Sequence, residues 1–338
     1  MDVITIKDIA RALNLSTSTI SRALRDSHEI SPDTKRLVMN YAAQMNYRPN
    51  SIALSLKENR SRAIGVVVPE IANYFFSQAI NGIEAVAYNR GYHVFIFQSH
   101  ELREREVLTV RQAVDRKVDG LLLSLSSETD DISHLTDLHR QNFPMVLFDR
   151  VSAELGTPCI VADDFGGAFA GTEHLIQTGR KRIALITIPP YISISRERLA
   201  GYRAALAHYG IDYTENLVRY AGFGQYEVDS LVEELLQQNP RPDAIFTVSD
   251  RLTLSCLRAL RARNIAIPDA VALIGFTNLP VADLLAPSLS TVGQPAEEIG
   301  HLAAGQLIDL IEHGPRAPRT GTIKLPSTLV VRESSAVI

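Results

Sequence analysis

Short apolar runs alternate with stretches of helical periodicity from Ala63 to the end of the chain. Between the runs, apolar residues recur at the spacing of amphipathic helices. This alternation is typical of an α/β fold with parallel sheets. The runs that predict buried strands are AIGVVV (63–68), YHVFIF (92–97), GLLLSL (120–125), MVLFD (145–149), CIVA (159–162), RIALIT (182–187), DAIFTV (243–248) and VALIGF (271–276).

An internal repeat runs through this α/β region. Segments 80–92 and 199–211 have similar patterns, with Gly82 and Gly201 at matching places 119 positions apart. Three more pairs are separated by 119 or 124 positions: Gly91 and Gly210, Asp119 and Asp243, Pro144 and Pro268. Any two α/β units share some spacing, so coincidence is the alternative to a duplicated lobe. Two similar lobes would leave a crevice lined by loops at the carboxyl ends of their strands.

The first sixty residues have a different pattern, which predicts three short helices. Each begins after a hydroxyl residue suited to an N-cap: Thr5, Ser16 and Ser31. The third also has a proline at its first position and an acid in its first turn. Two short helices around a tight turn, braced by a third, form a helix-turn-helix.

The second of these helices, within STSTISRALR (16–25), presents an unusually polar face. A solvated helical subdomain would explain it, but a recognition helix in a major groove explains the position of each polar residue better. We expect Thr17, Ser18 and Arg22 to reach base edges, and Ser16 and Thr19 to meet phosphates. Arg22 is the candidate for a bidentate contact to guanine.

Charge is distributed unevenly along the 338 residues. The net charge is −4, yet residues 1–60 contain nine Lys and Arg against six acids and the remainder is acidic. A basic amino-terminal segment on an acidic body indicates a polyanionic partner at one end only. The hydrophobic content of 46% and charged content of 21% are those of a globular protein. The length predicts two or three folding units.

The segment TIKDIARALNLSTSTISRALRDSHEISPDTKRLVMNYAAQMNYRPNSIALSLK resembles the headpiece of the lactose-repressor/galactose-repressor family of bacterial transcription regulators. The T-I-x-D-I-A opening, S-x-x-T-I-S-R-A-L helix, N-Y-x-P-N segment and A-x-x-L hinge carry the resemblance, which covers essentially the whole chain. It implies a sequence-specific regulator, most simply a repressor. It also implies a small all-α helix-turn-helix headpiece on a two-lobed, periplasmic-binding-protein-like body.

The resemblance divides the chain into a headpiece (1–49), a hinge and linker (50–61) and a body (62–338). We expect one lobe at about 62–162 plus 292–324 and the other at about 163–291 plus 325–338. The eight hinge residues 50–57 are too few for a stable isolated helix. The resemblance implies that two hinges fold together in the minor groove, with Leu56 as the wedge, Ala53 allowing close approach and Lys57 reaching the DNA. A linker whose leucines pack on the body is the alternative. Thr5, Ser21, Ser31, Tyr47 and Asn50 complete the candidate DNA-binding set.

Candidate effector-binding residues lie after strands or at expected crossings between the lobes. Aromatic faces can cover the C–H faces of a polyhydroxyl ligand while polar groups bind its hydroxyls. Helix caps or mutual pairing would equally explain some of these residues. Thr277, where many relatives have aspartate, and Ser249-Asp250, where an Asn-Asp pair is common, leave the ligand open between sugars, anionic sugars and nucleobases. The candidates are Asn73, Phe75, Phe76, Asp149, Arg198, Phe223, Asp250, Thr277 and Gln294.

Other classes of protein fit the sequence poorly. No nucleophile-elbow, phosphate-loop, dinucleotide or H-E-x-x-H motif is present, so we expect no enzyme, cofactor or metal. The amino terminus has an acid at position 2 and no long apolar run, so we expect no signal peptide and no membrane span. The two cysteines, Cys159 and Cys256, are far apart, so we expect no disulfide and a cytoplasmic protein. A solute-binding protein would lack the headpiece. The expected partners are a pseudo-palindromic DNA operator, a small effector and a second copy in a homodimer. No leucine heptad follows residue 332, so a tetramer is not expected.

Overall fold

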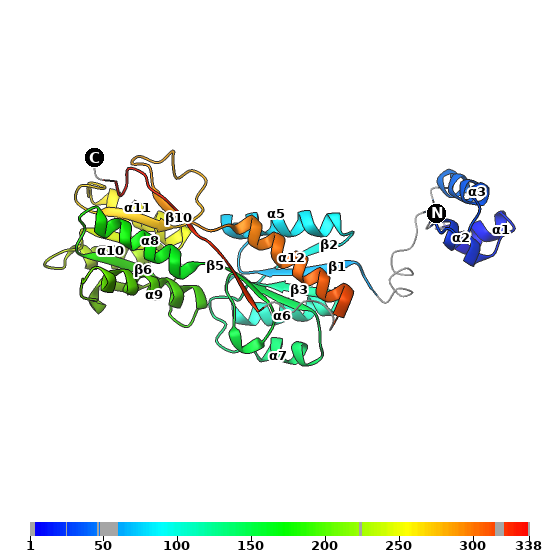
Figure 1. The fold of residues 1–338 in the computed structure, drawn as a ribbon, viewed down its shortest axis with the longest axis horizontal. Helices are drawn as coiled ribbons and strands as arrows, with labels where there is room; N and C mark the ends of the chain where they lie inside the picture. The colour runs from blue at the N-terminus through cyan, green and yellow to red at the C-terminus, as the bar shows by residue number, and fades with distance from the viewer. Residues whose placement is uncertain are drawn as a thin grey trace. The chain divides into compact units, whose positions relative to one another are not determined.

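The computed structural model describes residues 4–24, 26–45, 47, 60–222, 225–314 and 321–336. The chain forms two compact units: Met1–Ser61, which contains the headpiece (1–49), and Arg62–Ile338, which is the body. Figure 1 shows the blue helices of the headpiece and, within the body, two α/β lobes.

The described residues of the headpiece form α1 (Ile6–Ala12), α2 (Thr17–Leu24) and α3 (Pro32–Gln44). Small and branched apolar side chains from all three helices form its core, because each helix is apolar along one stripe only. Ser16 Oγ accepts from Thr19 N at 3.0 Å and Ser31 Oγ from Thr34 N at 3.3 Å, so the expected caps begin α2 and α3. The buried residues are Ile9, Ala10, Ile20, Ala23, Val38 and Ala42.

The first lobe contains a six-stranded sheet in the order β11-β5-β4-β3-β1-β2, parallel at every pair. The interior strands are buried along their whole length, as expected for a parallel sheet covered on both faces. The strands are β1 (Ala63–Val68), β2 (His93–Gln98), β3 (Gly120–Leu123), β4 (Met145–Phe148), β5 (Cys159–Ala162) and β11 (Thr322–Leu325).

The second lobe repeats this arrangement with the order β12-β10-β9-β8-β6-β7. Only the β10–β12 pair is antiparallel. The strands are β6 (Ile183–Thr187), β7 (Val218–Tyr220), β8 (Ala244–Thr247), β9 (Ala272–Phe276), β10 (Ser290–Gly293) and β12 (Thr328–Val330).

Helices cover both sheets. In Figure 1 the orange helix α12 lies beside the cyan helix α5 in the first lobe, and α8 lies beside α9 in the second. Helix α12 therefore returns the chain to the first lobe. The first lobe has α5 (Tyr74–Asn89), α6 (Arg103–Asp115), α7 (Ser133–Arg140) and α12 (Ala296–His313), and the second has α8 (Asp164–Gln177), α9 (Ser193–His208), α10 (Gln225–Leu236) and α11 (Asp250–Ala262). Two 3₁₀ turns span Ala153–Leu155 and Glu215–Leu217.

Matched glycines set the helix contact in each lobe. A Cβ at Gly82 on α5 would lie 2.0 Å from the carbonyl oxygen of Glu297, and one at Gly201 on α9 would lie 2.2 Å from that of Phe165. Both glycines therefore let a neighbouring helix approach at backbone distance. The 119-residue spacing thus marks the same packing contact in two lobes of the same strand order, which supports duplication over coincidence.

The chain crosses between the lobes after β5, after β10 and after β11. β10 ends at Gly293 and β11 at Leu325, close to the approximate lobe boundaries expected near 291 and 324. The sequence did not predict these strands because neither is an unbroken apolar run: β10 has the sequence STVG and β11 the sequence TIKL. Strand β7, with three residues and a partly exposed pattern, was missed for the same reason.

Candidate functional site: an exposed helix face and an interlobe cluster

The outer face of α2 is open and its inner face is packed. Thr17, Ser18 and Arg22 are exposed, whereas Ile20 and Ala23 lie in the headpiece core. Ser16 Oγ lies 2.7 Å from Ser18 Oγ and 2.8 Å from Thr19 Oγ1, so these hydroxyls form one network at the start of the helix. The structure therefore brings the predicted α2 residues together on one accessible surface.

The remaining headpiece candidates are placed less uniformly. Thr5 donates from its backbone N and from Oγ1 to the Asp8 carboxylate, at 3.0 and 2.6 Å, so it acts at least as a helix cap. Ser21 is half-buried, Ser31 caps α3, and Tyr47 packs against the core. Asn50, Ala53, Leu56 and Lys57 of the hinge, and Phe223 of the body, lie outside the described residues.

A chain of hydrogen bonds links predicted residues of the two lobes. Gln294 Nε2 donates to Asp149 Oδ1 at 3.4 Å, at the end of β4. Gln294 also exchanges two 2.7 Å bonds with the side chain of Asn278, which follows β9. The hydroxyl of Thr277 in turn donates to Asp250, the first residue of α11. Asp149, Asp250, Thr277, Asn278 and Gln294 are called the interlobe cluster.

Arg198 lies within the second lobe, at 2% exposure, with most of its donors occupied. Nε and Nη2 contact Asp164 Oδ1 at 2.8 and 2.7 Å, and Nη1 donates to the carbonyl of Val248. The guanidinium carbon lies 3.8 Å from the ring centroid of Phe276. Asp164 is therefore a residue of this site that the sequence analysis missed, although its place beside the first crossing was a usable signal.

The predicted aromatic residues are buried in the first lobe. Phe75 and Phe76 are 5% and 3% exposed and pack edge to face, and Phe76 also packs on Phe148 of β4. Asn73 accepts from Phe75 N at 2.9 Å and caps α5. Its helix-capping role, one alternative for these candidates, is thus established in the structure.

The other two arginines near the interlobe cluster, Arg150 and Arg196, differ in burial and in pairing. Arg150 pairs with Glu101 at 2.6 and 3.1 Å and is 7% exposed. Arg196 is exposed, because helical spacing turns it away from buried Arg198. Arg150 and Arg196 nevertheless line one pocket of about 260 Å³ between loops of the two lobes.

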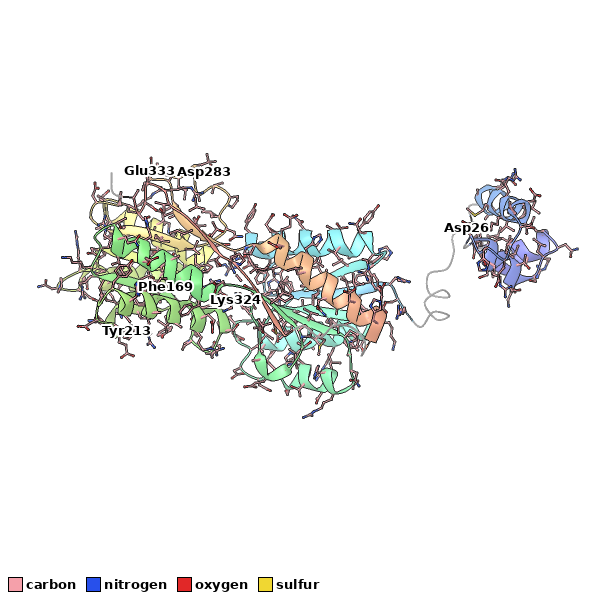
Figure 2. All side chains as sticks on the ribbon, in the orientation of Figure 1. Asp26, Phe169, Tyr213, Asp283, Lys324 and Glu333 are labelled. Atoms are coloured by element: carbon pink, nitrogen blue, oxygen red, sulfur yellow. The ribbon has the colours of Figure 1, made fainter. Side chains whose placement is uncertain are left out.

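Two other pockets lie between the lobes and are lined by predicted residues. Thr277 and Gln294 line one of about 480 Å³, and Asp149 lines one of about 200 Å³ together with Asp164 and Lys324. Figure 2 labels Lys324, on β11, near the junction of the lobes, and its Nζ lies 3.7 Å from Asp163 Oδ1.

Burial makes the carboxylates of this region hard to ionise. It raises the pKa of Asp149 to about 6, with Arg150 as the strongest opposing influence. It also raises the pKa of Asp164, opposed by Arg198, and that of Asp250, opposed by the hydrogen bond from Thr277. Burial therefore opposes ionisation of all three carboxyl groups, and the nearby cations and hydrogen bonds offset it only in part.

The same regions match known proteins. Residues 5–50 match the family model for bacterial regulatory proteins of the lacI family, and residues 172–335 match the model for a periplasmic binding protein-like domain. The ribose operon repressor of Halalkalibacterium halodurans is 31% identical over 331 residues, covering 98% of this chain and 97% of the relative.

The chain belongs to the lacI family of bacterial regulatory proteins.

Other members of the lacI family are similar over the same length. The HTH-type transcriptional repressor PurR of Vibrio campbellii is 29% identical over 333 residues, covering 98% of each chain. A solved structure described as a transcriptional regulator CelR–cellobiose complex has a TM-score of 0.73 and 29% identity, covering 98% of this chain and 99% of that one.

Membership in the lacI family identifies the headpiece as a DNA-binding helix-turn-helix and the body as an effector-binding domain. The family consists of transcription regulators, which are not enzymes. Within the described residues no group of three or more His, Cys, Asp and Glu could hold a metal ion. None of the described helices is long and apolar enough to cross a membrane.

Proposed function

We propose that this chain is a homodimeric repressor whose affinity for a pseudo-palindromic operator is controlled by a sugar or sugar derivative bound between the lobes. The observation that carries the proposal is the exposed α2 surface on a packed headpiece, joined in one chain to the interlobe cluster. One headpiece can contact only a few base pairs, so useful affinity requires two. The hinge residues Asn50, Ala53, Leu56 and Lys57 would complete the contact in the minor groove.

The dimer is proposed to form through the body. The edge strand β2 is parallel-paired on one side only and exposes Phe95 and Ile96 at 44% and 43%. Leu108 on the adjacent helix α6 is 54% exposed. An edge strand with exposed apolar side chains favours association with a second chain. Sedimentation of the full chain should therefore give a dimer, and Phe95→Asp should shift it toward the monomer.

The effector is proposed to be a neutral polyhydroxyl compound. Asp149, Asp164 and Asp250 lie within electrostatic range of Arg198, and Arg150 is already paired with Glu101. Around the pocket of Asp149 the carboxylates of Asp149, Asp164 and Glu197 outnumber the cations of Arg196 and Lys324. This balance favours the many hydroxyl donors of a sugar over a phosphate or uronate. The ribose and cellobiose named for two relatives support the same class.

Closure of the lobes would control the affinity of the chain for its operator. Glu70 of the first lobe pairs with Arg251 of the second, and Val151 N donates to Ser193 Oγ across the same junction at 3.1 Å. An effector that adds contacts to both lobes favours one lobe arrangement over another. In a dimer, that arrangement would set the spacing of the two hinges and so the affinity for the operator.

Two measurements on the full chain test the proposal. A thermal-shift screen of sugars, sugar phosphates, uronates and nucleobases identifies the effector, because a ligand of the folded state raises the melting temperature. Stabilisation by a neutral sugar supports the proposed class, and stabilisation only by an anion or a nucleobase contradicts it. Selection from random duplexes should yield a pseudo-palindrome, whereas an asymmetric site would contradict the dimer.

A further inference from the structure

The arginine expected to read a guanine does not stand alone on the headpiece surface. Arg22 Nη1 lies 3.0 Å from Oε2 of Glu29, which follows α2 in the connection to α3. The side chains are 54% and 52% exposed, so both heads lie on the accessible surface. A carboxylate here is unexpected, because it would repel the phosphates of a DNA duplex.

The position of Glu29 is fixed by the turn that carries it. Ser27 N donates to the carbonyl of Arg22 at 3.1 Å, and Ile30 N donates to the carbonyl of Ser27 at 3.2 Å. Ile30 packs against the headpiece core. Lys35 Nζ holds the start of the turn through Asp26 Oδ1 at 2.7 Å. The carboxylate is therefore presented to Arg22 from a defined backbone rather than from a loose loop.

Stability does not explain the pair. An exposed ion pair contributes little to folding, since solvent screens it and ordering two long side chains opposes it. Glu29 is also outside α2 and α3, so it supports neither helix by cap or spacing. The remaining physical consequence is the orientation of the Arg22 guanidinium.

We propose that Glu29 is a positioning residue that holds the Arg22 guanidinium for its contact with a guanine. Arginine has five N–H donors, and the contact with Glu29 uses Nη1. The edge formed by Nε and Nη2 remains available for a bidentate contact to the O6 and N7 of guanine. A pre-oriented guanidinium loses less conformational freedom on binding. Glu29 thus lowers affinity for unrelated DNA while raising selectivity at one base pair.

This inference rests on the proposed function, and its test begins with an operator selected from random duplexes by the wild-type chain. The base pair contacted by Arg22 is the one whose substitution weakens binding of the wild-type chain but does not change the affinity of Arg22→Ala. At that pair, Glu29→Gln should reduce discrimination roughly three- to tenfold, the scale of ordering one long side chain. Its affinity for a scrambled duplex should rise, because a charge that repels phosphate is gone.

Asp33→Asn is the matched control, because Asp33 is an exposed carboxylate of the same headpiece paired with Arg36 at 2.5 Å on α3. It removes the same charge and should raise affinity for scrambled DNA without changing discrimination at the Arg22 pair. In an Arg22→Ala background, Glu29→Gln should leave discrimination unchanged.

The outcomes separate the inference from the function on which it rests. Unchanged or improved discrimination in Glu29→Gln overturns the inference alone, as does a loss that persists without Arg22, which would mean that Glu29 reads a base itself. A wild-type chain that selects no sequence overturns the inference together with the proposed function.

Discussion

The side chains of Glu70 and Arg251 form an ion pair that joins the two lobes of the body. Glu70 follows β1 in the first lobe, and Arg251 is the second residue of α11 in the second. Since the partners belong to different lobes, their contact exists only while the lobes are close. The pair is partly exposed, so its effect is on the balance between lobe arrangements rather than on folding.

Arg251→Ala should shift the body toward wider lobe separations and weaken effector binding by up to about fivefold, the range of a partly exposed ion pair. Distance distributions between labels on the two lobes measure the shift. Arg258→Ala is the control, because Arg258 lies on the same helix but pairs at 3.3 Å with Asp229 of its own lobe. Equal distributions in all three proteins would contradict the role of the pair.

Effector affinity should depend on pH through Asp149. Burial raises its pKa to about 6, so below that value the carboxyl is increasingly protonated and loses an acceptor. For a ligand that donates to the carboxylate, affinity should be constant well above pH 6 and fall below it, by at most about tenfold per pH unit. Calorimetric titration from pH 5 to 8 measures this, and an unchanged profile in Asp149→Asn would assign the dependence to another group.

The raised pKa of Asp149 has the opposite effect on the folding stability of the ligand-free body, which decreases as the pH rises. The pKa of Asp149 is raised from 3.8 to about 6, so the folded state binds its proton more tightly. The stability that Asp149 contributes is therefore fully present below pH 3.8 and is lost as the pH rises through 6.

Arg198→Ala should destabilise the body by roughly 3–5 kcal/mol, because it leaves the Asp164 carboxylate buried without its cation. The side chains are 3% and 5% exposed, so solvent cannot replace the lost contact. Chemical denaturation at pH 7 measures the loss. Arg198→Met combined with Asp164→Asn should recover most of it, and a double variant as unstable as Arg198→Ala would contradict the explanation.

Arg22→Ala should lose preference for one base pair of the operator while retaining most affinity for unrelated duplexes. A bidentate contact to guanine contributes about 1–3 kcal/mol of discrimination, or roughly 5- to 150-fold. Binding measured against single-base variants of the selected operator shows which pair is affected. If affinity for all duplexes falls equally, Arg22 contacts phosphate rather than a base.

The sequence predicted the elements whose patterns are long or chemically distinctive. All eight predicted strands are present, and the headpiece helices begin at the expected caps, since apolar runs and Ser or Thr caps act locally. Strands β7, β10, β11 and β12 were missed, because each has only three or four residues and none is an unbroken apolar run. The exact crossings depended on ladders formed with distant strands, such as β11 with β5.

Contacts between distant residues could not be predicted from the sequence. Arg198 and Gln294 were both candidates, but no local pattern indicated their partners. Arg198 forms an ion pair with Asp164, and the side chain of Asn278 hydrogen-bonds to the backbone of Gln294. The pairing of Arg22 with Glu29 likewise depends on the turn that returns the chain. Such partners are fixed by tertiary structure, whereas residue type and place in a motif are fixed locally.

A ligand bound between the lobes is expected to control the affinity of the headpiece for DNA. The most direct test of this control is the dissociation constant of the full chain for its selected operator, measured with and without a saturating concentration of the compound found by thermal shift, at fixed salt. The account predicts a change of roughly 5- to 150-fold, corresponding to a coupling of about 1–3 kcal/mol. Equal dissociation constants in the two conditions would contradict it.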